Sequence, residues 1–231
     1  MKIDHLAQIL AAQAQKRPIA LATRLADGAQ SLYDGATCTG AVALSAEQLA
    51  EARGLLAAGR SASLAASQGA IFLRSYAPPA RLVVIGAVHI AQFLAPMAAL
   101  AGFEVIVIDP RQAFATEARF PGVTLVAEWP GPALARIGLD ERTAVVTLTH
   151  DPKLDDPALF AALQSPVFYI GALGSSRTHA KRIERLRELG LAELAPRIHA
   201  PVGLDLGGRA AAEIAVSVLA QVIQERYRRA P

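Results

Sequence analysis

Glycine, serine and arginine gather in one short segment of the chain, Gly171–Thr178, directly after an apolar run. Glycine lets a backbone approach a ligand closely, and the unpaired N–H groups at a helix start attract anions such as phosphate. Arg177 adds a side chain that can make a charge-assisted hydrogen bond. We therefore predict a phosphate-binding turn made of Gly171, Gly174, Ser175, Ser176, Arg177 and Thr178. A serine N-cap after a glycine-rich turn is the purely structural alternative, and the two interpretations are compatible.

A second turn, Gly86-Ala-Val-His89, follows the apolar run 82–85 and precedes a helical pattern. Dinucleotide-binding folds place the sequence G-x-G-x-x-G at this point, where the second glycine lets a pyrophosphate approach the backbone. Val88 takes the position of that second glycine, so its side chain should hinder a pyrophosphate. Gly86 and His89 are therefore candidates for ligand binding, and a simple strand-to-helix connection is the alternative.

Asp109 ends the next apolar run, 23 residues after Gly86. An acidic residue at this position of a dinucleotide fold accepts a hydrogen bond from a ribose hydroxyl, and Arg111 is suited to an adenosine 2′-phosphate or another anion. Both residues are candidates for cofactor binding. The sequence Asp109-Pro110-Arg111 is also typical of a turn without a ligand.

His150 and Asp151 follow the apolar run 143–149. Histidine titrates near neutral pH and a carboxylate can orient its ring, so the two side chains are candidates for an acid–base pair. Asp156 precedes a proline, which predicts that it is the N-cap of a helix. His179 is expected to face solvent. The five histidines of the chain are scattered, without the spacing of a metal site.

The elements that must position these turns alternate between strands and helices, which predicts an α/β fold with a doubly wound parallel sheet of the Rossmann type. Strands are predicted at 82–85, 104–108, 123–127, 143–149 and 167–170. Helices are predicted at 89–101, 132–137, 176–189 and 209–228, and another is predicted to start at Asp156. We expect residues 80–231 to form this Rossmann-like domain.

The first part of the chain shows a different pattern, typical of a small α+β domain over residues 1–77. Helical spacing covers 3–16, and Ser45-Ala-Glu-Gln48 is a capping box that starts a helix ending near Gly59. Strand-like runs lie at 19–24, 30–33, 37–44, 61–67 and 70–76. Pro78-Pro79 can continue neither a helix nor a central strand, so we place the domain boundary there.

The composition excludes several classes of protein. The 231 residues are 53% hydrophobic and 19% charged, which excludes an intrinsically disordered chain. The net charge is +3, and the basic clusters at 181–187 and 226–229 lie on helical patterns typical of a solvated helix surface, so we expect no nucleic-acid partner. One cysteine, Cys38, excludes an internal disulfide and a CxxC zinc site.

The uncharged stretch 82–103 is long enough to span a bilayer, because it runs over 22 positions without Asp, Glu, Lys or Arg. It contains His89, Gln92 and Pro96, so a buried strand, a turn and a core-facing helix explain it better. The first residues lack the apolar core and the cleavage site of a secretory signal. We expect a cytoplasmic protein without a membrane partner.

Five segments occur in an order that resembles a known family. They read GAVHIAQFLAPMAALAGFEVIVIDPR, RFP, LTHDPKLDDPAL, YIGALGSSRT and IHAPVGLDLGGRAAAEIAVSVLA. Together they closely resemble the C-terminal, Rossmann-like domain of the XdhC/CoxI family, the xanthine dehydrogenase accessory proteins, over roughly residues 80–225. The combination of THDPKLDDPAL with IGALGSxRT is highly specific.

Two features depart from that family. Its first turn resembles GAGH, so Val88 replaces a glycine. Its N-terminal domain has a glycine-rich segment that ends in a cysteine, of which residues 34–40 are at best a degenerate trace. We therefore expect Cys38 to be a buried structural thiol.

The resemblance implies a chaperone that binds the molybdenum cofactor (molybdopterin) and protects it during sulfuration by a cysteine desulfurase. It also implies insertion of that cofactor into a xanthine dehydrogenase-type molybdenum hydroxylase. No set of residues demands turnover, which favours a carrier over an enzyme. The alternatives are an NAD(P)-dependent oxidoreductase, which would use Asp109 and Arg111 and against which Val88 argues, and a structural adaptor with an empty crevice. A homodimer is one assembly open to such a protein.

Overall fold

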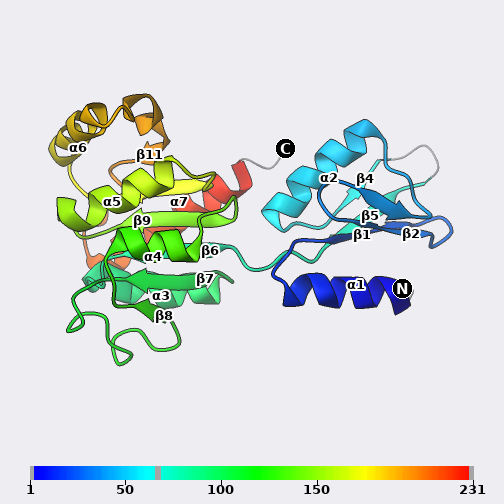
Figure 1. The fold of residues 1–231 in the computed structure, drawn as a ribbon, viewed down its shortest axis with the longest axis horizontal. Helices are drawn as coiled ribbons and strands as arrows, with labels where there is room; N and C mark the ends of the chain where they lie inside the picture. Colours follow the sequence, from blue (N-terminus) through cyan, green and yellow to red (C-terminus); the bar gives the residue numbers. More distant parts are fainter. Residues whose placement is uncertain (1–2, 66–68, 229–231) are drawn as a thin grey trace. The chain divides into compact units, whose positions relative to one another are not determined.

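The computed structural model describes residues 3–65 and 69–228, which fall into two compact units (Figure 1). One unit contains the residues up to Pro79 together with the end of the last helix from Tyr227, and the other spans Ala80–Arg226. Each unit has its own sheet and its own hydrophobic core.

The first unit is a five-stranded antiparallel sheet with the strand order β3-β2-β1-β5-β4. Its strands are β1 (Ala20–Arg24), β2 (Gln30–Tyr33), β3 (Cys38–Gly40), β4 (Ala62–Leu64) and β5 (Ile71–Ser75). Its helices are α1 (Ile3–Ala14) and α2 (Ala46–Ala58). Most of the predicted strands end earlier than expected, and positions 66 and 67 of the run predicted at 61–67 lie outside the described residues.

Alternation along β1 explains why both faces of this sheet are covered. Ala20 and Ala22 belong to the cluster that contains the buried face of α2, whereas Leu21 packs with Ile9 of α1. Successive side chains of a strand point to opposite faces, so one strand serves both helices. α2 begins at the predicted capping box headed by Ser45.

The second unit is a six-stranded sheet with the order β11-β10-β9-β6-β7-β8, in which every pair is parallel. Its strands are β6 (Arg81–Ile85), β7 (Glu104–Ile108), β8 (Thr124–Val126), β9 (Thr143–Thr147), β10 (Tyr169–Ala172) and β11 (Ile198–His199). This is the strand order of the doubly wound Rossmann fold. The predicted fold class is confirmed.

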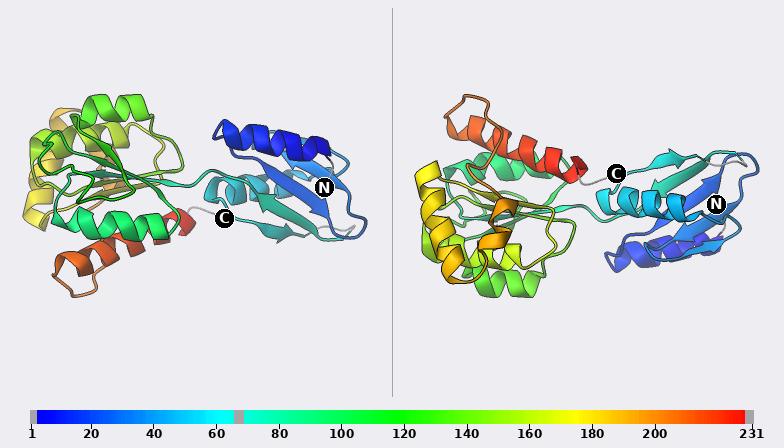
Figure 2. Two further views of the ribbon diagram at one scale, coloured as in Figure 1. Left: turned by 90° about the horizontal axis from the view of Figure 1, so that it is seen from below. Right: turned by 90° about the horizontal axis from the view of Figure 1, so that it is seen from above.

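Helices cover both faces of this sheet (Figure 2). They are α3 (His89–Leu100), α4 (Pro130–Ile137), α5 (Pro152–Leu163), α6 (Ser176–Glu188) and α7 (Ala211–Arg228), with a 3-10 helix at Ala192–Arg197. α3 and α7 pack on one face with strand residues such as Val84, and α4 and α5 pack on the other with residues such as Ile85. Strands buried on both faces explain the continuous apolar runs of the sequence.

The strand order reverses between β6 and β9, and open α/β sheets bind ligands outside the carboxyl ends of their strands at such a point. The turn after β6, the end of β7 and the loops after β9 and β10 all lie at this edge, because the strands are parallel. The uncharged stretch 82–103 is divided between β6, a turn and α3, as predicted. Among the described residues, no helix is long and apolar enough to cross a membrane.

Candidate functional site

The turn between β6 and α3 packs tightly against the segment that follows β9. Gly86 is buried with φ +103°, a conformation that favours glycine. A Cβ atom at this position would overlap the methyl group of Thr149, on the other side of the topological switch point. The fold itself therefore requires Gly86. Val88 is half-buried and is the N-cap of α3, without a side-chain capping bond.

His89 is exposed at the first position of α3. Its ring packs edge-on against Phe93, with ring centroids 5.1 Å apart, and its Nδ1 lies 3.1 Å from the side-chain amide of Gln92. These contacts hold the imidazole against its own helix.

The carboxylate of Asp109 is fully buried at the end of β7 and accepts four hydrogen bonds. Oδ1 accepts from the backbone N–H and the Nε of Arg111, at 2.9 and 2.8 Å. Oδ2 accepts from the N–H of Ala87 at 2.8 Å and from Nη2 of Arg111 at 2.7 Å. These four donors match the roughly four acceptor sites of a carboxylate. Asp109 thus ties the β6–α3 turn to Arg111, in the place where a dinucleotide fold would hold a ribose.

Two opposing effects act on the pKa of Asp109. Burial alone raises it, but the hydrogen bonds from Arg111 and Ala87 outweigh burial, and the pKa lies below its ordinary value. Arg111 is 41% exposed and also stacks on Phe114, with its guanidinium 4.8 Å from the ring centroid.

Gly171 has a packing role inside β10. A Cβ atom there would lie 2.5 Å from a methyl group of Val202 and 2.8 Å from the ring of Tyr169. The strand β10 runs over Tyr169–Ala172, so it begins and ends two residues later than the predicted run 167–170.

The start of α6 combines a glycine of positive φ with exposed hydroxyl and guanidinium groups. Gly174 has φ +138°, and a Cβ there would lie 3.0 Å from the side chain of Thr178. Ser175 is the N-cap, and its hydroxyl accepts a hydrogen bond from the N–H of Thr178 at 3.3 Å. Ser176 and Arg177 are the first two helical residues, both exposed. The first N–H groups of a helix have no partner within it, so this end is open to an anion.

The loop between β9 and α5 folds around the buried carboxylate of Asp155. Thr149 donates its hydroxyl to Oδ1 at 2.6 Å, and the N–H of His150 donates to Oδ2 at 3.0 Å. His150 is held with φ +63°, and burial raises the pKa of Asp155. The carboxylate of Asp151 accepts the N–H of Lys153, and in the described part of the chain no hydrogen bond joins it to the His150 ring. The predicted acid–base pair is not assembled.

Asp151, not Asp156, is the N-cap of α5, so the prediction for Asp156 is wrong. Two Asp-Pro pairs lie within residues 151–157, and the helix starts at the earlier one, with Pro152 at its first position. This start places Leu154 on the buried face. Asp156 instead accepts hydrogen bonds from the guanidinium of Arg185, with Nη2 2.9 Å from Oδ1.

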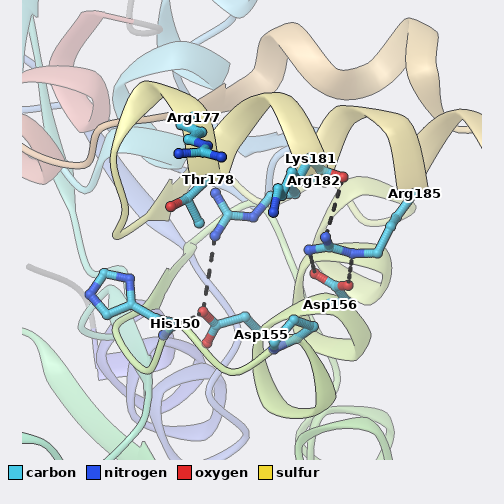
Figure 3. A pocket seen from close by; sticks show the side chains of 9 residues that line it. His150, Asp155, Asp156, Arg177, Thr178, Lys181, Arg182 and Arg185 are labelled. Carbon is cyan, nitrogen blue, oxygen red and sulfur yellow. Dashed lines mark hydrogen bonds and ion pairs between the residues drawn. The ribbon is translucent and has the colours of Figure 1, made fainter.

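A pocket of about 240 Å³ lies between the start of α5 and the inner side of α6 (Figure 3). Of the predicted site residues, it brings together His150, Arg177 and Thr178. Sequence reasoning missed the other lining residues as members of a site, and they are Pro152, Asp155, Asp156, Lys181, Arg182 and Arg185. The remaining predicted residues do not line this pocket. The lining contains four cationic side chains and two carboxyl groups.

Arg182 lies inside this pocket with its side chain only 2% exposed (Figure 3). Its Nη2 donates to the carbonyl of Leu173 at 3.2 Å and lies 4.0 Å from Oδ2 of Asp155. Its Nε and Nη1 are buried and have no hydrogen-bond partner within the described residues. Burial lowers the pKa of Arg182.

The expectation of a solvated surface over residues 181–187 is therefore wrong at Arg182. The sequence carries a signal that identifies it. Arg182 lies four residues after Thr178 and four before the buried Leu186, which puts all three on one helix face.

Two further expectations about single side chains are corrected. His179 does not face solvent freely, because it is half-buried. Burial lowers the pKa of its ring, and the positive charge of Arg182 lowers it further. Cys38 is half-buried rather than buried, because it lies on the edge strand β3. Its Sγ lies 3.5 Å from the carbonyl of Val42, and burial raises the pKa of the thiol.

In residues 3–65 and 69–228, no group of three or more His, Cys, Asp or Glu side chains is placed to hold a metal ion.

Residues 82–222 match the family model of the XdhC Rossmann domain. The match covers more than half of the chain and includes the pocket and the loops at the carboxyl edge of the sheet. The chain belongs to the XdhC family. The resemblance seen in the sequence motifs is confirmed.

Several curated proteins are similar to this XdhC family member over about two thirds of its chain. The molybdenum cofactor insertion chaperone PaoD of Escherichia coli K12 is 37% identical over 152 residues, which are 65% of this chain and 42% of PaoD. A probable xanthine dehydrogenase subunit of Bacillus subtilis 168 is 35% identical over 159 residues, 68% of this chain and 46% of that protein. An uncharacterized Escherichia coli protein, YqeB, is 36% identical over 157 residues, 67% of this chain and 29% of YqeB. The match thus spans less than half the length of each relative.

A solved structure also shares the fold. The crystal structure titled a xanthine dehydrogenase from Bacillus halodurans superposes with a TM-score of 0.74 at 21% identity. The similarity covers 98% of this XdhC family chain and 67% of the other chain. At this identity the comparison establishes the fold and nothing about activity.

Proposed function

We propose that this XdhC family protein is an accessory protein that binds the molybdenum cofactor and delivers it to a xanthine dehydrogenase-type molybdenum hydroxylase. The observation that carries the proposal is the 37% identity to the insertion chaperone PaoD over 152 residues. The cofactor is cargo here, so the chain has to bind and release it without transforming it.

The residues at the carboxyl edge of the sheet fit such a cargo. A molybdopterin carries a phosphate, and the α5–α6 pocket has a cationic lining with two buried guanidinium nitrogens that lack partners among the described residues. We propose that His150, Arg177 and Thr178 contact the cofactor, because they line this pocket. The other candidates do not line this pocket and stay proposals as cofactor-binding residues; they are Gly86, His89, Asp109, Arg111, Asp151, Gly171, Gly174, Ser175 and Ser176.

Sulfuration of the cofactor is proposed to depend on a partner, a cysteine desulfurase. A sulfur carrier needs a thiolate, and burial raises the pKa of Cys38, the single cysteine of the chain. We propose that the chain protects the cofactor while another enzyme supplies sulfur. Action in the cytoplasm and assembly as a homodimer belong to the same proposal.

An NAD(P)-dependent oxidoreductase has weaker support. Asp109 would have to give up Arg111 or Ala87 to accept a ribose hydroxyl. Val88, at the turn where a pyrophosphate would approach the backbone, carries a side chain in place of a glycine and is half-buried against the core. Both features argue against a bound dinucleotide.

The proposal is tested by cofactor retention in a pair of variants at the start of α6. Ser176→Asp places a carboxylate where an anion would bind, yet favours the helix through its dipole, so the fold is kept. Ser176→Asn is the matched uncharged control. Protein from cells that make the cofactor would be gel-filtered and oxidised, and its pterin measured by fluorescence. We expect pterin in the wild type and the Asn variant and a loss of about tenfold or more in the Asp variant. Wild-type protein without pterin contradicts the proposal.

A further inference from the structure

We propose that the α5–α6 pocket is a subsite for a phosphate monoester dianion, with Arg182 as its principal ligand. The inference rests on the proposed function only where it names the natural occupant, the phosphate of the bound pterin. Its physical basis is that the guanidinium of Arg182 is buried and only partly hydrogen-bonded. The binding turn predicted from the sequence did not include Arg182.

The guanidinium of Arg182 is oriented into the pocket but incompletely bonded. One nitrogen, Nη2, donates to the Leu173 carbonyl and lies 4.0 Å from the Asp155 carboxylate. Nε and Nη1 have no hydrogen-bond partner in the described part of the chain, although the side chain is only 2% exposed. Native proteins rarely leave buried donors unpaired, and a guanidinium binds phosphate oxygens through parallel hydrogen bonds. Nε and Nη1 lie on different edges of the guanidinium, so a phosphate in the pocket would satisfy one of these two donors.

The charges around Arg182 select a dianion. Arg185 is already bound to Asp156, and the Asp155 carboxylate accepts from Thr149 and His150. With both carboxyl groups ionised, the four cationic and two acidic side chains leave a net charge of two positive. Arg177 and Lys181 are exposed and make no ion pair within the described residues. They are available to a ligand oxygen together with the first N–H groups of α6.

The size of the pocket indicates which part of a ligand it takes. Its volume of about 240 Å³ lies below the roughly 300–1,000 Å³ of sites that enclose a whole ligand. It is therefore suited to one charged group, while the remainder of the ligand lies outside. His150, which is exposed, borders the pocket and is placed to contact that remainder (Figure 3).

The test measures inorganic phosphate binding to the full chain by titration calorimetry, at constant ionic strength set with chloride. Arg182→Gln removes the buried charge, and Arg177→Gln removes an exposed lining charge. Arg187→Gln is the matched control, because Arg187 is exposed on the same helix and does not line the pocket. We expect Arg182→Gln to weaken phosphate binding by at least about tenfold, Arg177→Gln by about threefold, and Arg187→Gln not at all. Sulfate should compete with phosphate.

A replacement variant and a pterin measurement complete the test. If Arg182→Gln does not fold by circular dichroism, the double variant Arg177→Gln/Lys181→Gln takes its place, because both side chains are exposed. Phosphate binding that is absent, or equal in all variants, overturns the subsite. Pterin retained in full by Arg182→Gln or the double variant overturns the assignment to the cofactor's phosphate. The two proposals can also be separated. If the variants weaken phosphate binding as expected but wild-type protein from cells contains no pterin, the subsite is supported and the proposed function is contradicted.

Discussion

Replacing Arg111 with methionine removes the charged partner of a buried carboxylate and keeps much of the side chain's apolar volume. Asp109 would lose two charge-assisted hydrogen bonds, at 2.8 and 2.7 Å, but would keep the backbone donors of Ala87 and residue 111. Breaking a buried ion pair costs about 3–5 kcal/mol, and the partial exposure of Arg111 reduces its share. We therefore expect Arg111→Met to lower the free energy of unfolding of this unit by about 2 kcal/mol at pH 7.

The effect should depend on pH with a defined sign. The pKa of Asp109 is lowered in the folded protein, so its stabilisation is present above the unfolded value of about 3.9 and is lost as the pH falls through the folded value. The difference between the wild type and Arg111→Met should therefore shrink between pH 7 and pH 3. Arg119→Met is the matched control, since Arg119 also stacks on Phe114 but has no ion pair to Asp109.

Urea unfolding of the full chain, followed by fluorescence of Trp129, measures this difference. Trp129 is the single tryptophan and lies in the second unit, so the signal reports on the unit that contains Asp109. A loss below about 0.5 kcal/mol at pH 7 would contradict the reasoning, because surface substitutions reach that size without a specific contact. A larger loss that is equal at pH 7 and pH 3 would contradict it too.

Three further predictions concern other positions. Gly86→Ala should destabilise the protein by about 2–3 kcal/mol more than Gly102→Ala, which has a positive φ and open space, and Thr149→Ser should recover part of that loss in thermal unfolding. NAD and NADP should bind with dissociation constants of about 10⁻⁴ M or weaker, and Val88→Gly should tighten that binding in calorimetry; micromolar affinity in the unmodified protein would reverse our preference for a carrier. Cys38 should react with a thiol reagent at pH 7 more slowly than free cysteine, and equal rates would show that burial does not raise its pKa.

The Rossmann fold was predictable because the burial of its strands on both faces requires a pattern that is visible in the sequence. Strands buried on both faces need continuous apolar runs, and the runs around Val84, Val107 and Val146 have no competing polar pattern. The end of β10 was not predictable in the same way. Gly171 packs closely against Val202, which lies 31 positions later in the chain, and no local pattern indicates that contact.

The candidate site was predicted only in part, because glycines and loop residues drew attention away from helix interiors. The loop residue His150 and the helix-start residue Arg177 do line the pocket. Asp155 and Arg182 were missed, because a charged residue on a helix is usually solvated. Each lies on the inward stripe of its helix, and tertiary packing, not local sequence, decides that two such stripes meet.

Transfer of the cofactor tests most directly that this protein carries the molybdenum cofactor to an enzyme. A cofactor-free xanthine dehydrogenase-type enzyme would be mixed with the loaded full chain, or with the same amount of free cofactor, and its recovered activity compared. We predict that the loaded chain restores more activity than the free cofactor, and that its own pterin content falls by the amount the enzyme gains. A chain that keeps its pterin, or that restores no more activity than free cofactor, would contradict the role of a carrier.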